Sequence, residues 1–439
     1  MEYEFVLGLE VHLQLNTKTK IFCWCKNDPF YAKEPNINVC PVCLGLPGAL
    51  PVLNKEAVNK SQQMAAALNS EVQGKIIFER KNYFYPDLPK GYQITCPHYP
   101  IGKAGAVDLT YFYDDKSSEK NHIIRLREVH LEEDTAKSMH KNDKTYIDFN
   151  KSGVPLLEIV SEPDIRSVDD AVEFCKEIQR IARTLEVSEA DMEKGNMRLE
   201  ANVSVRVKGD TKLPDYRVEL KNINSYGFMK KAVSYELRRQ VLVLENGEKL
   251  HQETRGFNES TGETFVQRSK EEADDYRYFP EPDIPPFEFD LGETRNITTL
   301  LPELPKKMRA DLQKDGLNTQ YVNILLENSE LRRKYKELIS AGYSSSESAK
   351  CVINVSKYKG LSADKIINEE KSKSSSLLES DNDLSPIIDA VLKENPEAVE
   401  DVKKGNENAI KFLIGNVMRR TSGKADPRKT SKLIRKKLS

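Results

Sequence analysis

Residues 6–15 alternate between aliphatic and polar side chains, a period of two that is typical of a β-strand with one buried face. Side chains two residues apart share a face of a strand. The aliphatic face consists of Leu7, Leu9, Val11, Leu13 and Leu15. The polar face consists of Glu10, His12 and Gln14. A carboxylate and an imidazole held side by side on a rigid strand can bind a divalent cation. A polar stripe that faces solvent is the alternative.

The same kind of polar face recurs in later segments. Glu158 interrupts the apolar run 154–160, and a charge in such a run needs a partner or a metal because burying it alone is very costly. The other polar faces comprise His130 with Glu132, then Arg198, Glu200, Asn202 and Ser204, then Glu219 with Lys221. Several strands with inward acids and bases predict a sheet-based site for a nucleotide and Mg²⁺. The sequence contains neither a P-loop nor a G-x-G-x-x-G fingerprint, so neither would hold that nucleotide.

Four of the seven cysteines form two close pairs. Cys23 and Cys25 are separated by one residue, and Cys40 and Cys43 follow after a loop of fourteen residues. Two thiolate pairs bridged by a short loop are the layout of a tetrahedral four-thiolate zinc site, which is closed and therefore structural. Four free cysteines in a reducing compartment are the alternative.

The N-terminal residues 1–5 carry no basic, signal-like or Arg/Ser-rich segment. No apolar run approaches the ~20 residues that span a bilayer. We therefore expect a cytoplasmic protein without a membrane span, in which a disulfide framework is not expected.

The chain changes character after the proline-rich stretch 280–286. Before it, strand patterns and aromatic residues dominate. After it, the sequence is polar, has helical periodicity and contains few aromatic residues, which predicts a domain boundary near 290. The serine- and lysine-rich stretch 369–383 is typical of a flexible linker. We therefore predict domains at 1–290, 291–368 and 384–439, the last a small helical tail whose first helix begins at Ser385-Pro386.

The tail is basic although the whole chain has a net charge of −2. Between residues 419 and 439 nine lysines and arginines stand against one acid, Asp426. Such a segment is either a contact for a phosphate backbone or a solvated helix face.

Taken together, several of these segments resemble the B subunit of glutamyl/aspartyl-tRNA amidotransferases. The matching stretches occur in the family's order along nearly the whole chain. They are residues 8–12, 80–87, 89–94, 130–134, 155–164, 197–202, 219–222, 274–282 and 412–418.

The resemblance implies a heterotrimer with an amidase-type A subunit and a small C subunit. The A subunit releases ammonia from glutamine and passes it through a channel. The B subunit uses Mg-ATP to phosphorylate the side-chain carboxylate of Glu on tRNA(Gln), and in many cases also that of Asp on tRNA(Asn). Ammonia then displaces phosphate. The implied fold is α+β. A cradle domain similar to the catalytic domains of glutamine synthetase and guanidino kinases carries a zinc knuckle at 23–43, and an all-α region and a helical tail follow it.

The resemblance also implies roles for individual residues, with a structural ion pair as the alternative for each. The implied magnesium set is Glu10, His12, Glu132 and Glu158. The resemblance places Lys81 and Glu133 near the channel mouth, where they would guide or deprotonate ammonium. It places Glu200 in the active-site sheet. Charge and location alone suggest the phosphate candidates Lys221, Arg255 and Arg277. The basic tail supplies the candidate tRNA contacts, which are Arg419, Arg420, Lys424, Arg428, Lys429 and Lys432.

The chain departs from the family at Glu200, where aspartate is also expected, and in the region 291–368, which is shorter. Three other interpretations compete. The archaeal relative of this family carries a large inserted domain that is not seen here. A ligase for a free amino acid needs no basic tail. An RNA-binding zinc-knuckle protein without catalysis would not carry inward acids, which repel RNA.

Overall fold

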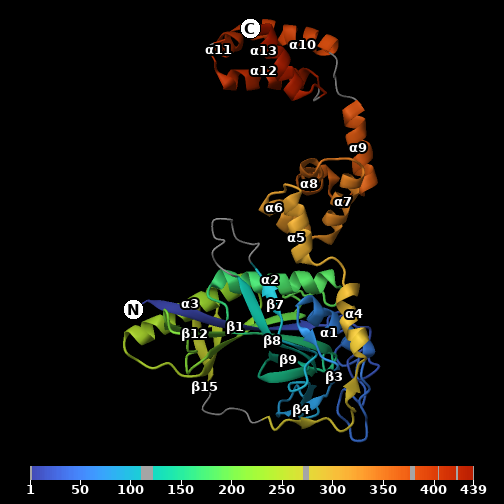
Figure 1. The fold of residues 1–439 in the computed structure, drawn as a ribbon, viewed down its shortest axis with the longest axis vertical. Coiled ribbons are helices and arrows are strands. Elements are labelled where there is room, and N and C mark those ends of the chain that lie inside the picture. The colour runs from blue at the N-terminus through green and yellow to red at the C-terminus, as the bar shows by residue number, and fades with distance from the viewer. Residues whose placement is uncertain are drawn as a thin grey trace. The chain divides into compact units, whose positions relative to one another are not determined.

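The computed structural model describes residues 2–109, 122–269, 276–375, 381–403, 405–421 and 424–438. The chain forms two compact units, Met1–Met308 and Arg309–Ser439 (Figure 1). Among the described residues no helix is long and apolar enough to cross a membrane.

A ten-stranded sheet dominates the first unit. Its centre consists of β12 (Met197–Val207), β1 (Tyr3–Gln14), β11 (Pro155–Ser161) and β8 (Ile123–Glu133), all antiparallel to their neighbours. Beyond β12 lie β13 (Val218–Ile223), β14 (Glu253–Asn258) and β15 (Glu263–Ser269), and beyond β8 lie β6 (Gly102–Lys103), β2 (Glu71–Val72) and β7 (Ala106–Asp108). Only the pair β13–β14 is parallel among these described strands.

Helices cover the aliphatic face of this sheet. They are α1 (Lys55–Ala67), α2 (Val168–Thr184) and α3 (Tyr226–Glu245), and each begins after a residue whose side chain accepts a hydrogen bond from the first turn, namely Asn54, Ser167 and Ser225. Figure 1 shows α2 and α3 running along one side of the strands. The predicted aliphatic face of β1 is confirmed, since every member from Leu7 to Leu15 is at most 1% exposed. The opposite, polar face of the sheet is thereby left for a site.

Smaller sheets border the large one. One consists of β16 (Phe279–Pro280), β4 (Glu79–Asn82) and β5 (Tyr92–Thr95). The others pair β17 (Phe287–Glu288) with β3 (Lys75–Ile76) and β9 (Lys137–Lys141) with β10 (Lys144–Asp148). Helix α4 (Leu291–Leu300) packs against α1, so the first compact unit continues past the expected boundary near 290.

The described part of the second unit is helical. Helix α5 (Pro305–Lys314) begins in the first unit and ends in the second. It is followed by α6 (Thr319–Glu327), α7 (Ser329–Ser340), α8 (Ser345–Asn354), the 3₁₀ turn η3 (Ser356–Tyr358) and α9 (Ala363–Ser375). The tail contains α10 (Asp381–Glu394), α11 (Pro396–Lys403), α12 (Glu407–Arg420) and α13 (Pro427–Leu438), which share one apolar core.

Two expectations for this unit differ from the structure. The stretch expected as a linker, 369–383, is helical up to Ser375, and its residues 376–380 lie outside the described part. The first tail helix begins at Asp381 and not at Ser385, so Pro386 lies inside it. Pro386 is the sixth residue of this helix, so it removes the hydrogen bond that its nitrogen would donate to the carbonyl four residues earlier.

Candidate active site on the polar face of the sheet

The register of the central strands brings distant polar residues into one row. His12 on β1 lies opposite Glu158 on β11 and opposite Arg198 on β12. Glu158 in turn lies opposite His130 on β8. Because directly opposed residues point to the same face of a sheet, these four side chains form a row across four strands. The sequence predicted the polar face of each strand, and the pairing adds which side chains meet.

Three of these polar side chains converge closely enough to share one ion. One donor atom each of His12, Glu132 and Glu158 lie within 4.8 Å of one another, and we call these residues the carboxylate cluster. His12 Nε2 lies 3.9 Å from Glu158 Oε1. Two carboxylates and one imidazole are a donor set that suits Mg²⁺ or Mn²⁺.

The electrostatics of the carboxylate cluster favour a bound cation. Burial, and next the charge of Glu158, raise the pKa of Glu132 to about 8. Burial lowers the pKa of His12, so its imidazole is neutral at pH 7. Burial acts to raise the pKa of Glu158, but His12, His130 and Lys81 outweigh it and lower that pKa. The residues therefore fit a divalent cation, which would relieve the repulsion between the two carboxylates.

Glu10 and Glu200 lie next to this cluster as a second acidic group. They are opposed on β1 and β12, and Asn202 Nδ2 donates to Glu10 Oε1 at 2.9 Å. Burial, and then Glu158 and Glu200, raise the pKa of Glu10. The ammonium of Lys221 lies 3.1 Å from Glu200 Oε2, and also 3.1 Å from Glu219 Oε1. The predicted residues Glu10, Glu200 and Lys221 thus share one face.

A cavity of about 480 Å³ opens beside Glu10 and is lined by two arginines that sequence reasoning missed, Arg127 and Arg217. On β8 the pairing steps from Glu128 to Leu126 while β11 advances by one residue, from Val160 to Ser161. Arg127 is therefore the extra residue of a β-bulge, which reverses the alternation of faces. If alternate residues are counted back from Glu132 without a bulge, Arg127 falls on the face opposite to that of Glu132. Only knowledge of the bulge corrects this assignment.

Lys81 on β4 approaches the carboxylate cluster from the small sheet. Its ammonium lies 4.7 Å from the centre of the Tyr276 ring. Burial acts to lower the pKa of Lys81, but Glu132, Tyr278 and Glu158 outweigh it and raise that pKa. Lys81 therefore remains a cation at neutral pH, which suits an anionic substrate and does not suit a base that deprotonates ammonium.

Glu133 points away from Lys81 and the carboxylate cluster, because neighbouring residues of a strand face opposite sides. Its carboxylate accepts hydrogen bonds from Lys90 Nζ at 2.5 Å and from the Ile94 backbone N–H at 2.9 Å. With Lys90 it lines a separate cavity of about 200 Å³, which Cys23 and Cys43 also border. The structure thus places Glu133 and Lys81 on opposite sides of β8.

The two arginines predicted as phosphate partners differ. Arg255 is buried, its Nε donates to Thr264 Oγ1 at 3.0 Å, and it forms ion pairs with Glu236 and Glu253. For Arg255 the structure favours the structural ion pair over a phosphate contact. Arg277 has an exposed side chain and a left-handed backbone, with φ of 46°. Residues 274–275 of its motif lie outside the described part.

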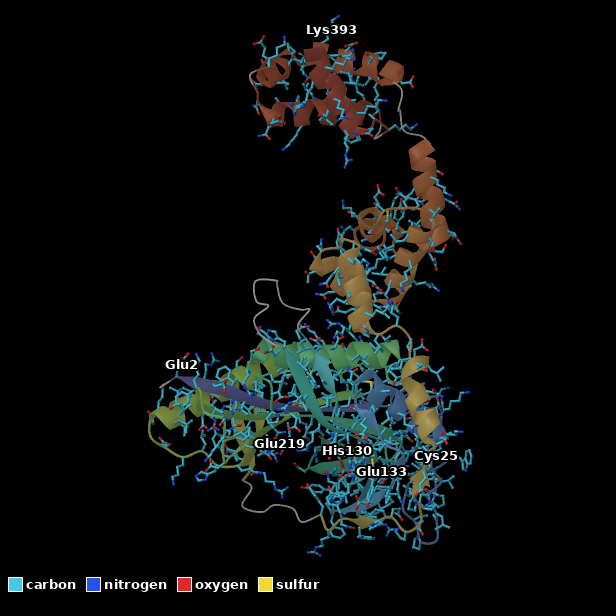
Figure 2. The ribbon with its side chains drawn as sticks, in the orientation of Figure 1. Glu2, Cys25, His130, Glu133, Glu219 and Lys393 are labelled. Carbon is cyan, nitrogen blue, oxygen red and sulfur yellow. The ribbon has the colours of Figure 1, made fainter. Side chains whose placement is uncertain are left out.

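The four cysteines meet as the spacing predicts. The four sulfur atoms lie within 4.8 Å of one another. We call their residues, Cys23, Cys25, Cys40 and Cys43, the thiol cluster. The fully buried Lys20 places its ammonium 3.6 Å from the sulfur of Cys43. Cys23, followed by weaker effects that include Lys20, lowers the pKa of Cys43 to about 4. Figure 2 shows Cys25 on the same side of the first unit as Glu133 and well separated from Glu219.

The basic residues of the tail divide into two groups. Arg420, Arg435 and Lys437 pair with Glu394, Glu407 and Asp389 of the tail itself. Of the other predicted tRNA contacts, those with exposed side chains are Arg419, Lys424, Arg428 and Lys432, and Lys429 is half-buried. Part of the positive charge is therefore neutralised inside the tail domain.

Fold and site together define the class of this chain: an α+β protein that carries a metal-competent carboxylate face on a large sheet, followed by a helical region. Comparison with known families agrees with this class. The sequence model of the GatB/GatE catalytic domain matches residues 5–293, and that of the GatB domain matches residues 304–438.

The chain belongs to the GatB family. It is 40% identical to the B subunit of the aspartyl/glutamyl-tRNA(Asn/Gln) amidotransferase of Persephonella marina, over the full length of both chains. The corresponding proteins of Clostridium kluyveri and Thermodesulfovibrio yellowstonii are 37% and 39% identical, with at least 99% of this chain and 99% of each relative covered. The alignment with the Persephonella protein extends over 485 positions, more than the 439 residues of this chain, so that relative has residues that this chain lacks.

Proposed function

We propose that this chain is the B subunit of a tRNA-dependent amidotransferase. It converts Glu attached to tRNA(Gln), Asp attached to tRNA(Asn), or both, into the corresponding amide. The observation that carries the proposal is the convergence of His12, Glu132 and Glu158 from three neighbouring strands. Full-length similarity to B subunits of aspartyl/glutamyl-tRNA(Asn/Gln) amidotransferases supports the substrate class.

The proposed chemistry makes a poor electrophile reactive. A carboxylate resists attack by ammonia, whereas its mixed anhydride with phosphate, formed from ATP, loses phosphate readily. The carboxylate cluster would hold Mg²⁺ with Glu10 beside it, and Mg²⁺ would supply neutralisation of phosphate charge. Lys81 supplies a fixed cation for the substrate carboxylate, and Glu200 and Glu219 hold the ammonium of Lys221 at the same face. Arg277 stays a candidate phosphate contact.

The nitrogen would come from partner subunits. The sequence has no nucleophile elbow with which to hydrolyse glutamine, so we assign ammonia release to an amidase-type A subunit, assembled with a small C subunit. Glu133 lines its cavity on the far side of β8 from Glu132. Gln93 lies between the two sides, because its Nε2 donates to the Glu133 carbonyl at 2.6 Å and it pairs with Lys81 across β4 and β5. Glu133 would guide ammonium and take its proton, and neutral ammonia would then pass Gln93 to reach the site beside Lys81.

The thiol cluster would hold zinc. Four thiolates saturate a tetrahedral ion, so this zinc would be structural and would fix the knuckle 23–43 of a cradle-type catalytic domain. Four thiolates around Zn²⁺ leave two net negative charges, and the buried ammonium of Lys20 offsets one of them.

The proposed division of labour follows the expected domains. Residues 1–290 would carry the chemistry, and the helical domain 291–368 and the tail 384–439, joined through 369–383, would bind tRNA. In the tail, phosphate contacts would come mainly from the basic side chains at 419, 424, 428, 429 and 432, each of which is exposed or half-buried. Arg420 already pairs with Glu394, so its contribution would be smaller.

The test is to co-express the chain with amidase and small-subunit partners and to follow Gln-tRNA formed from Glu-tRNA(Gln), ATP and glutamine. We expect ATP-dependent product that disappears in a Glu10→Ala/His12→Ala double variant. Product formation without ATP consumption, or tRNA binding without product, contradicts the proposal. Deletion of residues 384–439 should weaken tRNA binding and leave ATP turnover measurable.

A further inference from the structure

An unusual group of rings borders Lys81. We call it the aromatic cluster, and it consists of four tyrosines, Tyr83, Tyr85, Tyr276 and Tyr278, together with the exposed Phe84, which lies between Tyr83 and Tyr85 in the chain. Ring centres of Tyr83 and Tyr85 lie 6.0 Å apart, those of Tyr83 and Tyr276 6.1 Å, and those of Tyr276 and Tyr278 5.9 Å, all edge to face. Segments separated by almost two hundred residues thus build one aromatic surface.

The backbone holds this surface in place. Asn82 ties the two segments together, since its backbone N–H donates to the Tyr276 carbonyl at 3.0 Å and its side-chain amide to the Arg277 carbonyl at 2.9 Å. The loop from Tyr83 to Gly91 is closed by the Tyr83 N–H, which donates to the Gly91 carbonyl at 3.2 Å. Gly91 has φ of 73°, and a Cβ there would lie 3.1 Å from the Phe84 ring. The backbone that carries the rings is therefore held in place in both segments.

The aromatic cluster adjoins the site of the proposed reaction. Lys81 and Tyr83 lie on and directly after β4, and β4 pairs with β5. Strand β5 is fastened to β8 by Gln93, which bonds the Glu133 carbonyl. The ammonium of Lys81 lies over the Tyr276 ring, and the same ammonium is electrostatically coupled to Glu132 and Glu158. A molecule lying on these rings would reach the carboxylate cluster through Lys81.

Several of these rings are open to solvent. Phe84 is 88% exposed, Tyr85 58% and Tyr278 36%. Exposed aromatic faces interleaved with a cation are the usual platform for unpaired nucleotides, because every base has a face that can stack.

We propose that the aromatic cluster receives the unpaired 3′ end of the tRNA substrate, with terminal bases stacked on Phe84 and Tyr278. The amino acid esterified to that end then extends toward Lys81 and the carboxylate cluster. This inference rests on the proposed function, which makes an aminoacyl-tRNA the substrate. It adds the residues that position the reacting end, whereas the tail grips the tRNA elsewhere.

The experiment uses the complete complex with its partner subunits. We expect Phe84→Ala and Tyr278→Ala each to raise KM for Glu-tRNA(Gln) by on the order of tenfold, the range found for loss of one stacked base. KM for ATP and for glutamine should not change. Phe84→Tyr should restore the wild-type KM, and Phe84→Leu should not, because leucine keeps apolar area without a stacking face. Tyr146→Ala, which removes an exposed ring of β10, is the matched control.

A second readout does not depend on turnover. tRNA(Gln) with 2-aminopurine as its 3′-terminal base should lose fluorescence when it binds the wild-type complex, because stacking quenches this base. The loss should be smaller with Phe84→Ala or Tyr278→Ala. If KM for Glu-tRNA(Gln) and the quenching are both unchanged in the two variants, the inference is overturned. The proposed function still stands in that case if the complex forms Gln-tRNA.

Other outcomes also decide. If the variants release partner subunits in size-exclusion chromatography, or if Phe84→Leu behaves like the wild type, the surface binds protein and the inference is overturned. If the wild-type complex makes no Gln-tRNA, the proposed function fails on its own. The quenching of the labelled tRNA then still tests whether the aromatic cluster receives a 3′ end.

Discussion

The thiol cluster and the carboxylate cluster are both able to hold a metal, and they are built in opposite ways. The thiol cluster comes from one segment of twenty-one residues, Cys23 to Cys43, so its members are neighbours in the chain before folding. The carboxylate cluster takes His12, Glu132 and Glu158 from three strands. Its two carboxylates repel each other, whereas Lys20 supports the thiolates. The local cluster is therefore suited to stabilise structure, and the dispersed one to change its charge during a reaction.

The largest expected effect concerns the carboxylate cluster. Glu158→Gln keeps size and removes the charge, so we expect transamidation to fall by about 10²–10³-fold, as when one preorganised electrostatic group is lost. Zinc content should remain that of the wild type. Glu71→Gln, at an exposed position of β2, is the control for a generic loss of one acid. A loss of zinc in Glu158→Gln would show that the two clusters are not independent.

A substitution in the thiol cluster tests the independence of the two clusters in the opposite direction. Cys43→Ser should abolish zinc binding, measured by atomic emission on the purified chain, and lower Tm by more than about 5 °C, because metal-binding free energy is folding free energy. Residual transamidation at low temperature should keep the wild-type KM for ATP. Cys351→Ser, outside the cluster, is the matched control. An unchanged Tm together with lost zinc would contradict a structural role.

The charge of the carboxylate cluster predicts a pH dependence. The pKa of Glu132 is raised to about 8, so below that pH the cation must displace a proton from the free site. Mg²⁺ should bind more tightly as pH rises from 6 to 8, by at most about tenfold per unit, and then level off. His12 adds no proton because its pKa is lowered. Calorimetry in buffers of different ionisation enthalpy measures the released proton, and Glu132→Gln should remove the dependence.

Lys20 supports the thiol cluster without being one of the four cysteines that would bind the metal. Lys20→Met keeps the buried chain but removes the ammonium near Cys43, and we expect zinc affinity to fall by about 10–100-fold, as for other groups outside the ligand shell. Competition with a chelator of known affinity measures it. Lys18→Met, on a more exposed neighbour, should leave the affinity unchanged. Equal affinities in both variants would contradict the role of Lys20.

Sequence reasoning reached different depths in the two regions. Paired spacing was enough to predict that all four cysteines meet, because closing a short loop costs little conformational entropy. For the sheet it reached the polar face of each strand, and it also suggested that Lys81 and Glu133 lie near a channel mouth and that Arg255 contacts a phosphate. Both suggestions needed long-range information, since Glu133 turns to Lys90 and Arg255 is occupied by Glu236. Arg127 was missed because a bulge changes its face.

What the sequence determined by itself is local: the alternation that buries Leu7 to Leu15, the thiol pairs, and the helical character of the region after the proline-rich stretch. What only the tertiary structure decided is which strands are neighbours and in which register, and hence that His12 meets Glu158 and Glu132. The physical reason is that side-chain direction follows from each residue's own backbone. Register depends on packing between segments more than a hundred residues apart, and the pattern within one strand does not contain it.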